Sequence, residues 1–245
     1  MIRLAKEGDF LTPPKDETRL RIHSLRRAYG LEVPFIQFYS DGEGSLLCIM
    51  DGVAFFSPAA TVTEEWTYFL TANPAIRSIH CPQNAASAIA DSGEWLARTG
   101  VVLRYEGERG VLPSNSNVCR TPKLPAVYAL LAECFDTIQP FDAWYVDVSH
   151  RVRHDCCQIA CICDGDRVVS TAMTVAETES AAILGQVATA PTHRRQGLAA
   201  KCVSDLILRC KADELYILPV NERAQALYVG LGFAPCDNWA ELIRN

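Results

Sequence analysis

Hydrophobic positions recur along the chain with two different periods, and each period predicts a type of secondary structure. Residues 198–210 place apolar or small side chains at alternating spacings of three and one, which puts one apolar stripe on a helix. Residues 158–177 instead hold two apolar runs around an Asp-Gly turn, which predicts a β-hairpin. The second half of the chain thus gives helices at 124–135 and 141–154, the hairpin, a strand at 183–190, the helix at 198–210, a strand at 214–220, a helix at 222–231 and a final strand or strand pair at 233–244.

The first half of the chain carries a similar run of elements. Residues 16–30 have a helical pattern that a glycine ends, and Asp-Gly turns separate the strands that follow. The predicted elements are the helix at 16–30, strands at 35–41, 45–52 and 52–58, a helix at 64–73, a strand at 77–81, a helix at 83–99 and a strand at 101–107.

Both halves share the order β-β-β-α-β-α-β, which predicts an α/β protein (α+β, with a mixed sheet) in which one architecture occurs twice. The segment 107–123 is polar, contains two prolines and has few large apolar side chains, so it is the expected linker. The sequence therefore predicts two domains, residues 1–110 and residues 111–245, without clear identity between their residues.

Composition and charge exclude some classes of protein. The 245 residues suffice for one large or two small domains, and nearly half of them are hydrophobic, as in globular proteins. A net charge of −6 argues against nucleic acid as the main partner, because phosphate backbones require a basic surface. The chain has no run of about 18 apolar residues, and its charged start lacks the apolar core of a signal peptide. We expect a cytoplasmic monomer or homodimer that binds neither nucleic acid nor membranes.

The eleven cysteines predict buried thiols more than disulfides or a metal site. Their odd number and the lack of a signal peptide argue against a disulfide framework. One cluster, HDCCQIACIC, brings together His154, Cys156, Cys157, Cys161 and Cys163 and leaves a metal site open. However, the last three cysteines alternate along a predicted strand, and no second ligand cluster follows. We expect buried strand cysteines and no metal.

The stretch PTHRRQGLAAK at 191–201 is the strongest local signal for a ligand. A helix that begins near Gly197 leaves its first amide groups without partners inside the helix, and its dipole favours an anion there. Gly197 lacks a Cβ, so a ligand can approach the backbone, while Arg194 and Arg195 supply donors suited to phosphate oxygens. The stretch lacks the Gly-Lys-Ser/Thr of a P-loop, so hydrolysis of a nucleoside triphosphate is not indicated. Taken alone, it also fits a charged loop that enters an ordinary helix.

A second group of residues lies downstream, in VNERAQALYVGLGF at 220–233. Asn221 follows a strand and can cap the next helix. Tyr228 lies on or beside the apolar stripe of that helix, where its hydroxyl needs either a hydrogen-bond partner or a chemical role. Gly232 can close the helix in the left-handed conformation.

Together, VATAPTHRRQGLAAKCVSDLI and LYILPVNERAQALYVGLGF resemble the GNAT superfamily of N-acetyltransferases. The family's [Q/R]-x-x-G-x-[G/A] motif is matched by Arg194, Gly197 and Ala199, and its later strand–Asn–helix segment by Asn221, Ala224 and Tyr228. The resemblance implies the GNAT acyl-CoA N-acyltransferase fold, with acetyl-CoA as cosubstrate and a primary amine of a small molecule or peptide as acceptor. It also implies contacts with the cofactor from Val187, Ala188, Thr189, Arg194, Arg195, Gln196, Gly197, Leu198, Ala199, Asn221 and Tyr228.

The resemblance further implies how these contacts are divided. The pyrophosphate would lie against the amides of residues 194–199, and the pantetheine arm would pair like an extra strand with residues 187–189. A β-strand amide would stabilise the developing oxyanion, and Tyr228 would act as general acid and protonate the departing thiolate.

The group that takes the proton from the amine is where the sequence departs from the better-known pattern. Many members of the family carry a glutamate in the strand before the motif, whereas ILGQVATA at 183–190 contains no acid. Glu177 or Glu179, in the turn before that strand, is the nearest candidate base, and a chain of water molecules is equally open. Both glutamates also fit an ordinary solvated turn, which we favour.

Four aromatic side chains near the predicted site receive ordinary structural roles. Trp144 and Tyr145 lie on the second predicted helix, where family members often line the acceptor pocket, but we favour core packing for them. We expect His150 and His193 to be solvated.

The first half carries no R-x-x-G-x-A motif, and SPAATVTEE at 57–65 has neither glycine nor arginine where such a loop would lie. We therefore expect a degenerate GNAT-like copy that does not bind CoA, packs on the catalytic half and shapes the acceptor site. The alternative to an enzyme is a non-catalytic CoA-binding or regulatory module, which would suit the missing strand glutamate. The intact motif at 194–199 argues against a pure interaction protein.

Overall fold

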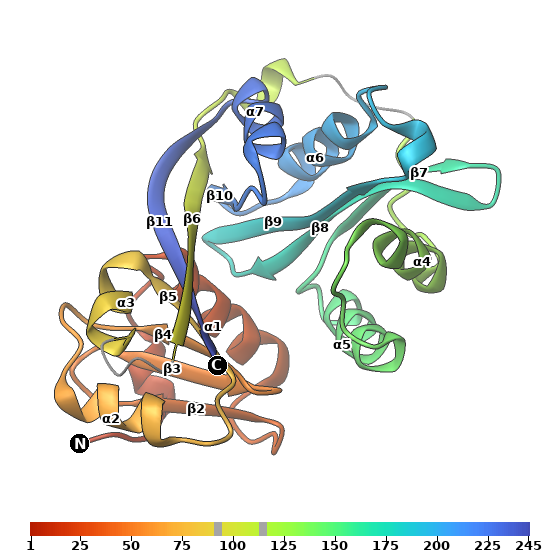
Figure 1. Cartoon of the computed structure of the whole chain (residues 1–245). Helices are drawn as coiled ribbons and strands as arrows, with labels where there is room; N and C mark the ends of the chain where they lie inside the picture. The colour runs from red at the N-terminus through yellow and green to blue at the C-terminus, as the bar shows by residue number, and fades with distance from the viewer. Residues whose placement is uncertain (91–94, 113–116) are drawn as a thin grey trace. The chain divides into compact units, whose positions relative to one another are not determined.

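The computed structural model describes residues 1–90, 95–112 and 117–245, and the chain divides into two compact units (Figure 1). Unit 1 comprises Met1–Val102 and Pro235–Asn245, and unit 2 comprises Leu103–Ala234. The chain therefore passes between the units inside β6 (Trp95–Tyr105) and again inside β11 (Phe233–Arg244). These divisions differ from the predicted boundary between residues 110 and 111, because the polar composition of a linker does not reveal where long strands find their pairing partners.

Unit 1 is built on a sheet with helices on both faces. Its elements are β1 (Arg3–Leu4), the 3-10 helix η1 (Glu7–Phe10), α1 (Glu17–Tyr29), β2 (Ile36–Ser40), β3 (Leu46–Met50), β4 (Val53–Ser57), α2 (Glu64–Ala72), β5 (Ser78–Pro82), α3 (Gln83–Ala90) and parts of β6 and β11. The strands lie in the order β1-β2-β3-β4-β5-β11, and neighbours are antiparallel except β4 and β5. Ile22 of α1 packs with Phe38 on one face, while Trp66 of α2 and Ile89 of α3 share a core with Ile79 on the other.

Local signals explain both ends of α1. The Asp16 Oδ1 atom accepts a hydrogen bond from the Arg19 amide at 2.7 Å and caps α1, and Gly30 closes that helix with a φ of 74°. The helix predicted over 83–99 is wrong in its second part, because α3 ends at Ala90 and β6 already begins at Trp95. Helical spacing is a weak signal over such a short stretch, and strand pairing overrides it. Residues 91–94 lie outside the described part of the chain.

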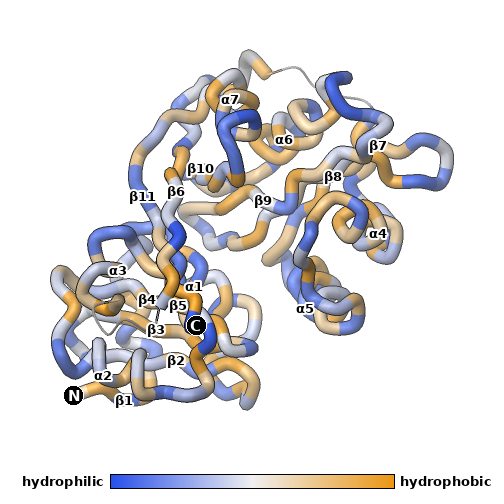
Figure 2. The backbone as a smooth tube through the Cα atoms, viewed as in Figure 1, coloured by the Kyte–Doolittle hydropathy of each residue, from blue (hydrophilic) through white to orange (hydrophobic). Residues whose placement is uncertain are grey.

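Unit 2 repeats this plan with a sheet between two helical layers. Its elements are the 3-10 helix η2 (Arg109–Val111), α4 (Leu124–Cys134), α5 (Phe141–Arg153), β7 (Ile159–Asp164), β8 (Arg167–Glu177), β9 (Ala181–Thr189), the 3-10 helix η3 (Pro191–His193), α6 (Leu198–Arg209), β10 (Glu214–Ile217), α7 (Glu222–Gly230) and parts of β6 and β11. The strands lie in the order β6-β10-β9-β8-β7. Helices α4 and α5 cover one face of this sheet and α6 covers the other (Figure 1). Hydrophobic residues follow the strands, and the loop before α6 is hydrophilic (Figure 2).

The separation of β9 from β10 is the feature that positions the site. The two strands are parallel and pair from Glu214 opposite Ala181 to Ile217 opposite Leu184. β10 then ends, whereas β9 continues to Thr189 and stays paired with β8 on its other side. Within the described residues, no strand pairs with β9 on the β10 side beyond Leu184. The backbone of β9 is therefore open to a ligand along its last residues.

Candidate functional site

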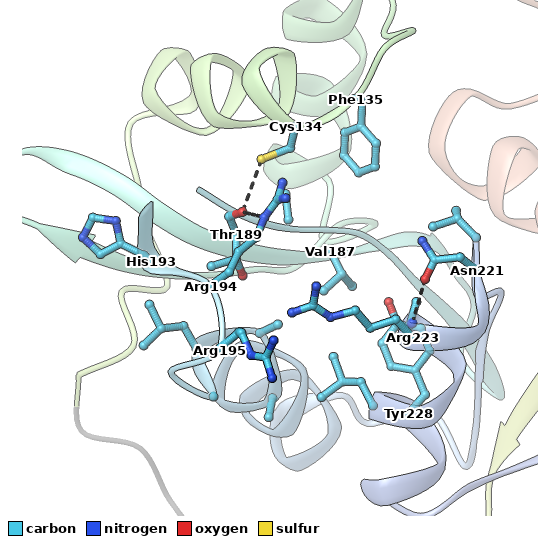
Figure 3. A pocket seen from close by; sticks show the side chains of 18 residues that line it. Cys134, Phe135, Val187, Thr189, His193, Arg194, Arg195, Asn221, Arg223 and Tyr228 are labelled. Atoms are coloured by element: carbon cyan, nitrogen blue, oxygen red, sulfur yellow. Dashed lines mark hydrogen bonds between the residues drawn. The ribbon is translucent and has the colours of Figure 1, made fainter. Parts of the chain in front are cut away.

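A cavity of about 400 Å³ lies where β9 and β10 separate (Figure 3). Its walls come from the end of β9, the start of α6, the start of α7 and the end of α4. Ten of the eleven residues predicted to bind a cofactor line it: Val187, Ala188, Thr189, Arg194, Arg195, Gly197, Leu198, Ala199, Asn221 and Tyr228. Gln196 is exposed and does not line the cavity. The structure thus brings together two motifs that lie more than twenty residues apart in the chain.

The start of α6 offers backbone donors to the cavity. Gly197 precedes the helix with a φ of 72°, in the left-handed region, and Arg195 shares that region with a φ of 67°. A Cβ built on Gly197 would meet no atom within 4 Å, so the backbone faces open space. Among the residues that the structure describes, no side chain caps this helix, so its first amide groups are available to an anion.

Three arginines give the cavity its charge. Arg194 donates from Nε to the Thr189 carbonyl at 3.1 Å, which holds its guanidinium beside the end of β9. Arg195 comes from the loop before α6, and Arg223 comes from the first turn of α7 and extends into the cavity (Figure 3). Among the described residues, no carboxylate lines this cavity or forms a salt bridge with these three side chains. Three uncompensated positive charges around helix amides favour a ligand with several negative charges.

Tyr228 lies on the inner side of α7, and its side chain is 6% exposed. Asn221 fixes the start of this helix, because its Oδ1 atom accepts a hydrogen bond from the Ala224 amide at 2.9 Å. In the described part of the chain, no group hydrogen-bonds to the Tyr228 hydroxyl, although the residue lines the cavity. Burial raises the pKa of Tyr228 to about 12, so the phenol keeps its proton at neutral pH. The side chain can therefore donate a hydrogen bond or a proton to a ligand.

The two candidate bases do not line the cavity. Glu177 is buried, and its carboxylate accepts hydrogen bonds from the Gln158 Nε2 atom and the Thr174 hydroxyl, both at 2.9 Å. It pairs with Ala182, and the six residues from there to Ala188 span about 20 Å of strand. Glu179 is exposed in the turn between β8 and β9. The lining therefore gives the assignment of either glutamate as base no support, and that assignment stays a prediction.

Eight lining residues were not among the predicted cofactor contacts. Ala224 matches the family's later motif but was not predicted to contact the cofactor, and Arg223 lies beside it in the segment after Asn221, where the helix cap could have indicated it. The end of α4 carries no such signal, because it reaches the cavity from more than fifty residues upstream. There the Cys134 thiol donates to the Thr189 carbonyl at a sulfur–oxygen distance of 3.5 Å. The full set of lining residues that were not predicted is Cys134, Phe135, His193, Ala200, Val220, Arg223, Ala224 and Leu227.

Three of the four aromatic side chains differ from expectation. Core packing is confirmed for Trp144, which is 1% exposed, but Tyr145 is 40% exposed. His193 is not simply solvated, because it lines the cavity and its Nε2 atom lies 3.4 Å from the Asp164 carboxylate. His150 is half-buried and stacks on His154 with the ring centroids 4.1 Å apart.

The cysteine cluster is largely part of the sheet. Cys156, Cys157 and Cys161 are buried, as expected for apolar thiols, whereas Cys163 is exposed at the end of β7. The prediction of a buried cysteine is therefore wrong for Cys163, which lies next to the turn between β7 and β8. All eleven cysteines are free, and the described residues contain no group of three side chains suited to a metal ion. Over the same residues, no helix is long and apolar enough to cross a bilayer.

Comparison with known proteins agrees with this geometry. Residues 160–241 match the family model for GNAT acetyltransferases, and no curated protein matches the chain. A GCN5-related N-acetyltransferase from Kribbella flavida has 17% identity and a TM-score of 0.56, covering 82% of this chain and 86% of its own. A second one, from Sphaerobacter thermophilus, has 15% identity and a TM-score of 0.59, covering 100% and 96%.

A tandem GNAT protein from the clavulanic acid biosynthesis pathway, determined without AcCoA, resembles the chain in the same way. It has 12% identity and a TM-score of 0.54, and the match covers 91% of this chain and 86% of the other. At identities this low, the structural similarity shows the fold alone. It confirms the predicted α/β fold and its tandem arrangement. The chain therefore has the GNAT fold in tandem, and its residues 160–241 match the model of the GNAT acetyltransferase family.

Proposed function

We propose that this protein is an acetyl-CoA-dependent N-acetyltransferase that passes the acetyl group directly to a primary amine of a small molecule or peptide. The observation that carries the proposal is the cavity between β9 and β10, where an open strand, a free helix start, three arginines and a protonated tyrosine meet. The acceptor, the oligomeric state and the cytoplasmic location stay predictions.

The lining residues fit the parts of acetyl-CoA in order along the cavity. The amides around Gly197, with Arg194 and Arg195, suit the pyrophosphate. Residues 187–189 of β9 have no described partner strand on the side of β10, so their backbone groups are open there. The pantetheine arm carries amide groups and can pair with them as a strand does. The three positive charges match a ligand with several phosphate charges better than they match an uncharged ligand.

The residues also fit the chemistry of acetyl transfer. Bound acetyl-CoA would supply the acetyl group as a thioester, whose carbonyl a neutral amine attacks. Tyr228 holds a proton at neutral pH and lines the cavity, so it can donate that proton to the sulfur as the thiolate leaves. The attacking amine loses one proton to solvent, and the Tyr228 phenolate regains one from solvent, so the phenol is restored for the next turnover. The arginines stay with the phosphates and do not take part in the transfer.

A second candidate function is a non-catalytic CoA-binding or regulatory module. The observation in its favour is that the described lining contains no carboxylate that could take the proton from the amine. Such a module would use the same phosphate and pantetheine contacts but would release no thiol. Both functions therefore predict binding of acetyl-CoA, but only the enzyme predicts release of CoA thiol.

Calorimetry with acetyl-CoA tests the binding step on the full chain. Gly197→Glu adds bulk and a negative charge at the helix start, and we expect it to abolish binding. Gly165→Glu is the control, because Gly165 also has a positive φ, of 58°, and no atom within 4 Å of a built Cβ, but it does not line the cavity. Unchanged affinity in Gly197→Glu would refute the assignment of the cavity to acetyl-CoA.

Thiol release across a panel of primary amines then separates the enzyme from the module. The enzyme should release CoA with at least one amine, and Tyr228→Phe should slow that reaction. Tight binding of acetyl-CoA together with no thiol release from the whole panel would favour the regulatory module.

A further inference from the structure

Arg223 is the arginine of the cavity that the phosphate-binding loop does not supply. It comes from α7, on the wall opposite the start of α6, and its side chain extends into the cavity (Figure 3). Arg223 is exposed, and the described residues show no hydrogen bond or salt bridge to its guanidinium. Its donors are thus available to a ligand.

The position of Arg223 is unfavourable for α7 itself. The helix begins at Glu222, so Arg223 stands in the first turn, where the positive end of the helix dipole repels a cation. The neighbouring Asn221 satisfies the Ala224 amide, so Arg223 is not needed to cap the helix. This cation opposes its own helix and points into a cavity whose described lining holds no carboxylate, so an anionic ligand explains it better than helix stability does.

The number of charges indicates which anion this is. A pyrophosphate diester carries two negative charges, and the helix amides with Arg194 and Arg195 already offer two positive charges and several donors for it. CoA carries one more anionic group, the 3′-phosphate on its ribose, and a phosphomonoester has up to two negative charges at neutral pH. A third arginine from a separate wall matches this separate phosphate.

We propose that Arg223 binds the 3′-phosphate of CoA and thereby makes the site prefer CoA over dephospho-CoA, which ends in the same adenosine but lacks that phosphate. The inference rests on the proposed function, because it assumes a CoA ligand in this cavity. It adds a residue that determines specificity on the cofactor side. Arg194 and Arg195 would bind both ligands equally.

The test is calorimetry of the full chain with CoA and with dephospho-CoA. A hydrogen-bonded charge pair corresponds to about 10- to 100-fold in affinity, so wild type should bind CoA tighter than dephospho-CoA by at least about tenfold. Arg223→Gln should bring the two affinities within about twofold by weakening CoA alone, and Arg223→Lys should keep part of the preference. Arg153→Gln, an exposed arginine of α5 outside the cavity, controls for the change in net charge and should match wild type.

The outcomes separate this inference from the proposed function. If Arg223→Gln weakens both ligands equally, the side chain contacts the pyrophosphate and the inference is overturned. If wild type binds both ligands equally well, no residue recognises the 3′-phosphate and the inference also fails, while the proposed function stands. If wild type binds neither, the proposed function itself fails. Unchanged thermal midpoints of the variants show that each outcome reflects the ligand contact.

Discussion

Gln186 lies in β9 just after the strand stops pairing with β10, and we expect its side chain to stabilise unit 2. It follows the last paired residues of β9, and its φ of 47° lies in the left-handed region, which a residue with a side chain rarely adopts. Its Oε1 atom accepts a hydrogen bond from the Trp144 indole nitrogen at 3.2 Å, and Trp144 is 1% exposed. The perturbation is Gln186→Ala, which keeps the backbone strain and removes the acceptor.

The magnitude follows from the indole that is left behind. A buried donor without a partner costs about 1–3 kcal/mol, so Gln186→Ala should lower the free energy of unfolding by about 2 kcal/mol. Gln186→Gly loses the same hydrogen bond but relieves a left-handed conformation that costs a non-glycine residue about 1 kcal/mol, so it should be the milder change. In a Trp144→Phe background no indole remains, and there Gln186→Ala should cost less than about 0.5 kcal/mol.

Chemical denaturation of the four proteins of this double-mutant cycle, followed by circular dichroism, measures the coupling. A cost of Gln186→Ala that is equal in both backgrounds would refute the hydrogen bond as the source of stability. A Gln186→Gly variant less stable than Gln186→Ala would refute the role assigned to the positive φ. Calorimetry with acetyl-CoA on the same variants would show how far the opening of the strands depends on this bond.

Three further predictions concern single side chains. Tyr228→Phe should lower kcat by about 10²–10⁴ with little change in KM or Tm, and wild type should show no alkaline fall in rate below about pH 10, since burial raises the pKa of Tyr228 to about 12. Asp205 is 2% exposed and pairs with two arginines, so Asp205→Ala should destabilise by about 2–3 kcal/mol and lower Tm by about 5–10 °C in a thermal melt. The pKa of Glu17 is lowered to about 2 because contacts with His80 and Arg21 outweigh the large opposing effect of burial. Its stabilising contribution is present above pH 4.5 and is lost as the pH falls toward 2, so denaturation at several pH values should show a steeper loss in wild type than in Glu17→Gln.

The sequence could predict the parts of the site that are local. The loop around Gly197 and the cap at Asn221 each depend on a few adjacent residues, and the structure places both in the predicted strand–helix context. Contributions from distant segments could not be predicted in the same way. Cys134 reaches the cavity only because α4 packs on β8 and β9, and no spacing within α4 indicates that position.

The position of Glu177 relative to the cavity could not be predicted from the sequence. Its place in the chain, just before β9, made it the nearest acid to the motif. The register of β8 against β9 then sets it opposite Ala182, at the far end of the strand from Ala188, and Gln158 and Thr174 occupy its carboxylate. Because β8 and β9 are antiparallel and joined by a short turn, a residue at the end of β8 lies beside the start of β9. The motif follows the other end of β9, so Glu177 is far from it in space.

Strands β6 and β11 each contribute residues to both units, and this limits how the roles of the two units can be separated. Leu103 and Arg104 of β6 pair with β10, so a fragment cut at the predicted linker, residues 112–245, lacks a strand of unit 2. The same fragment keeps residues 235–245, whose partner strand β5 it has lost. Inactivity of that fragment would therefore report an incomplete sheet, and it would say nothing about whether unit 1 shapes the acceptor site. Because every described lining residue of the cavity belongs to unit 2, cofactor binding and acceptor selection can instead be separated in the full chain, by substitutions in unit 1 that leave the affinity for acetyl-CoA unchanged.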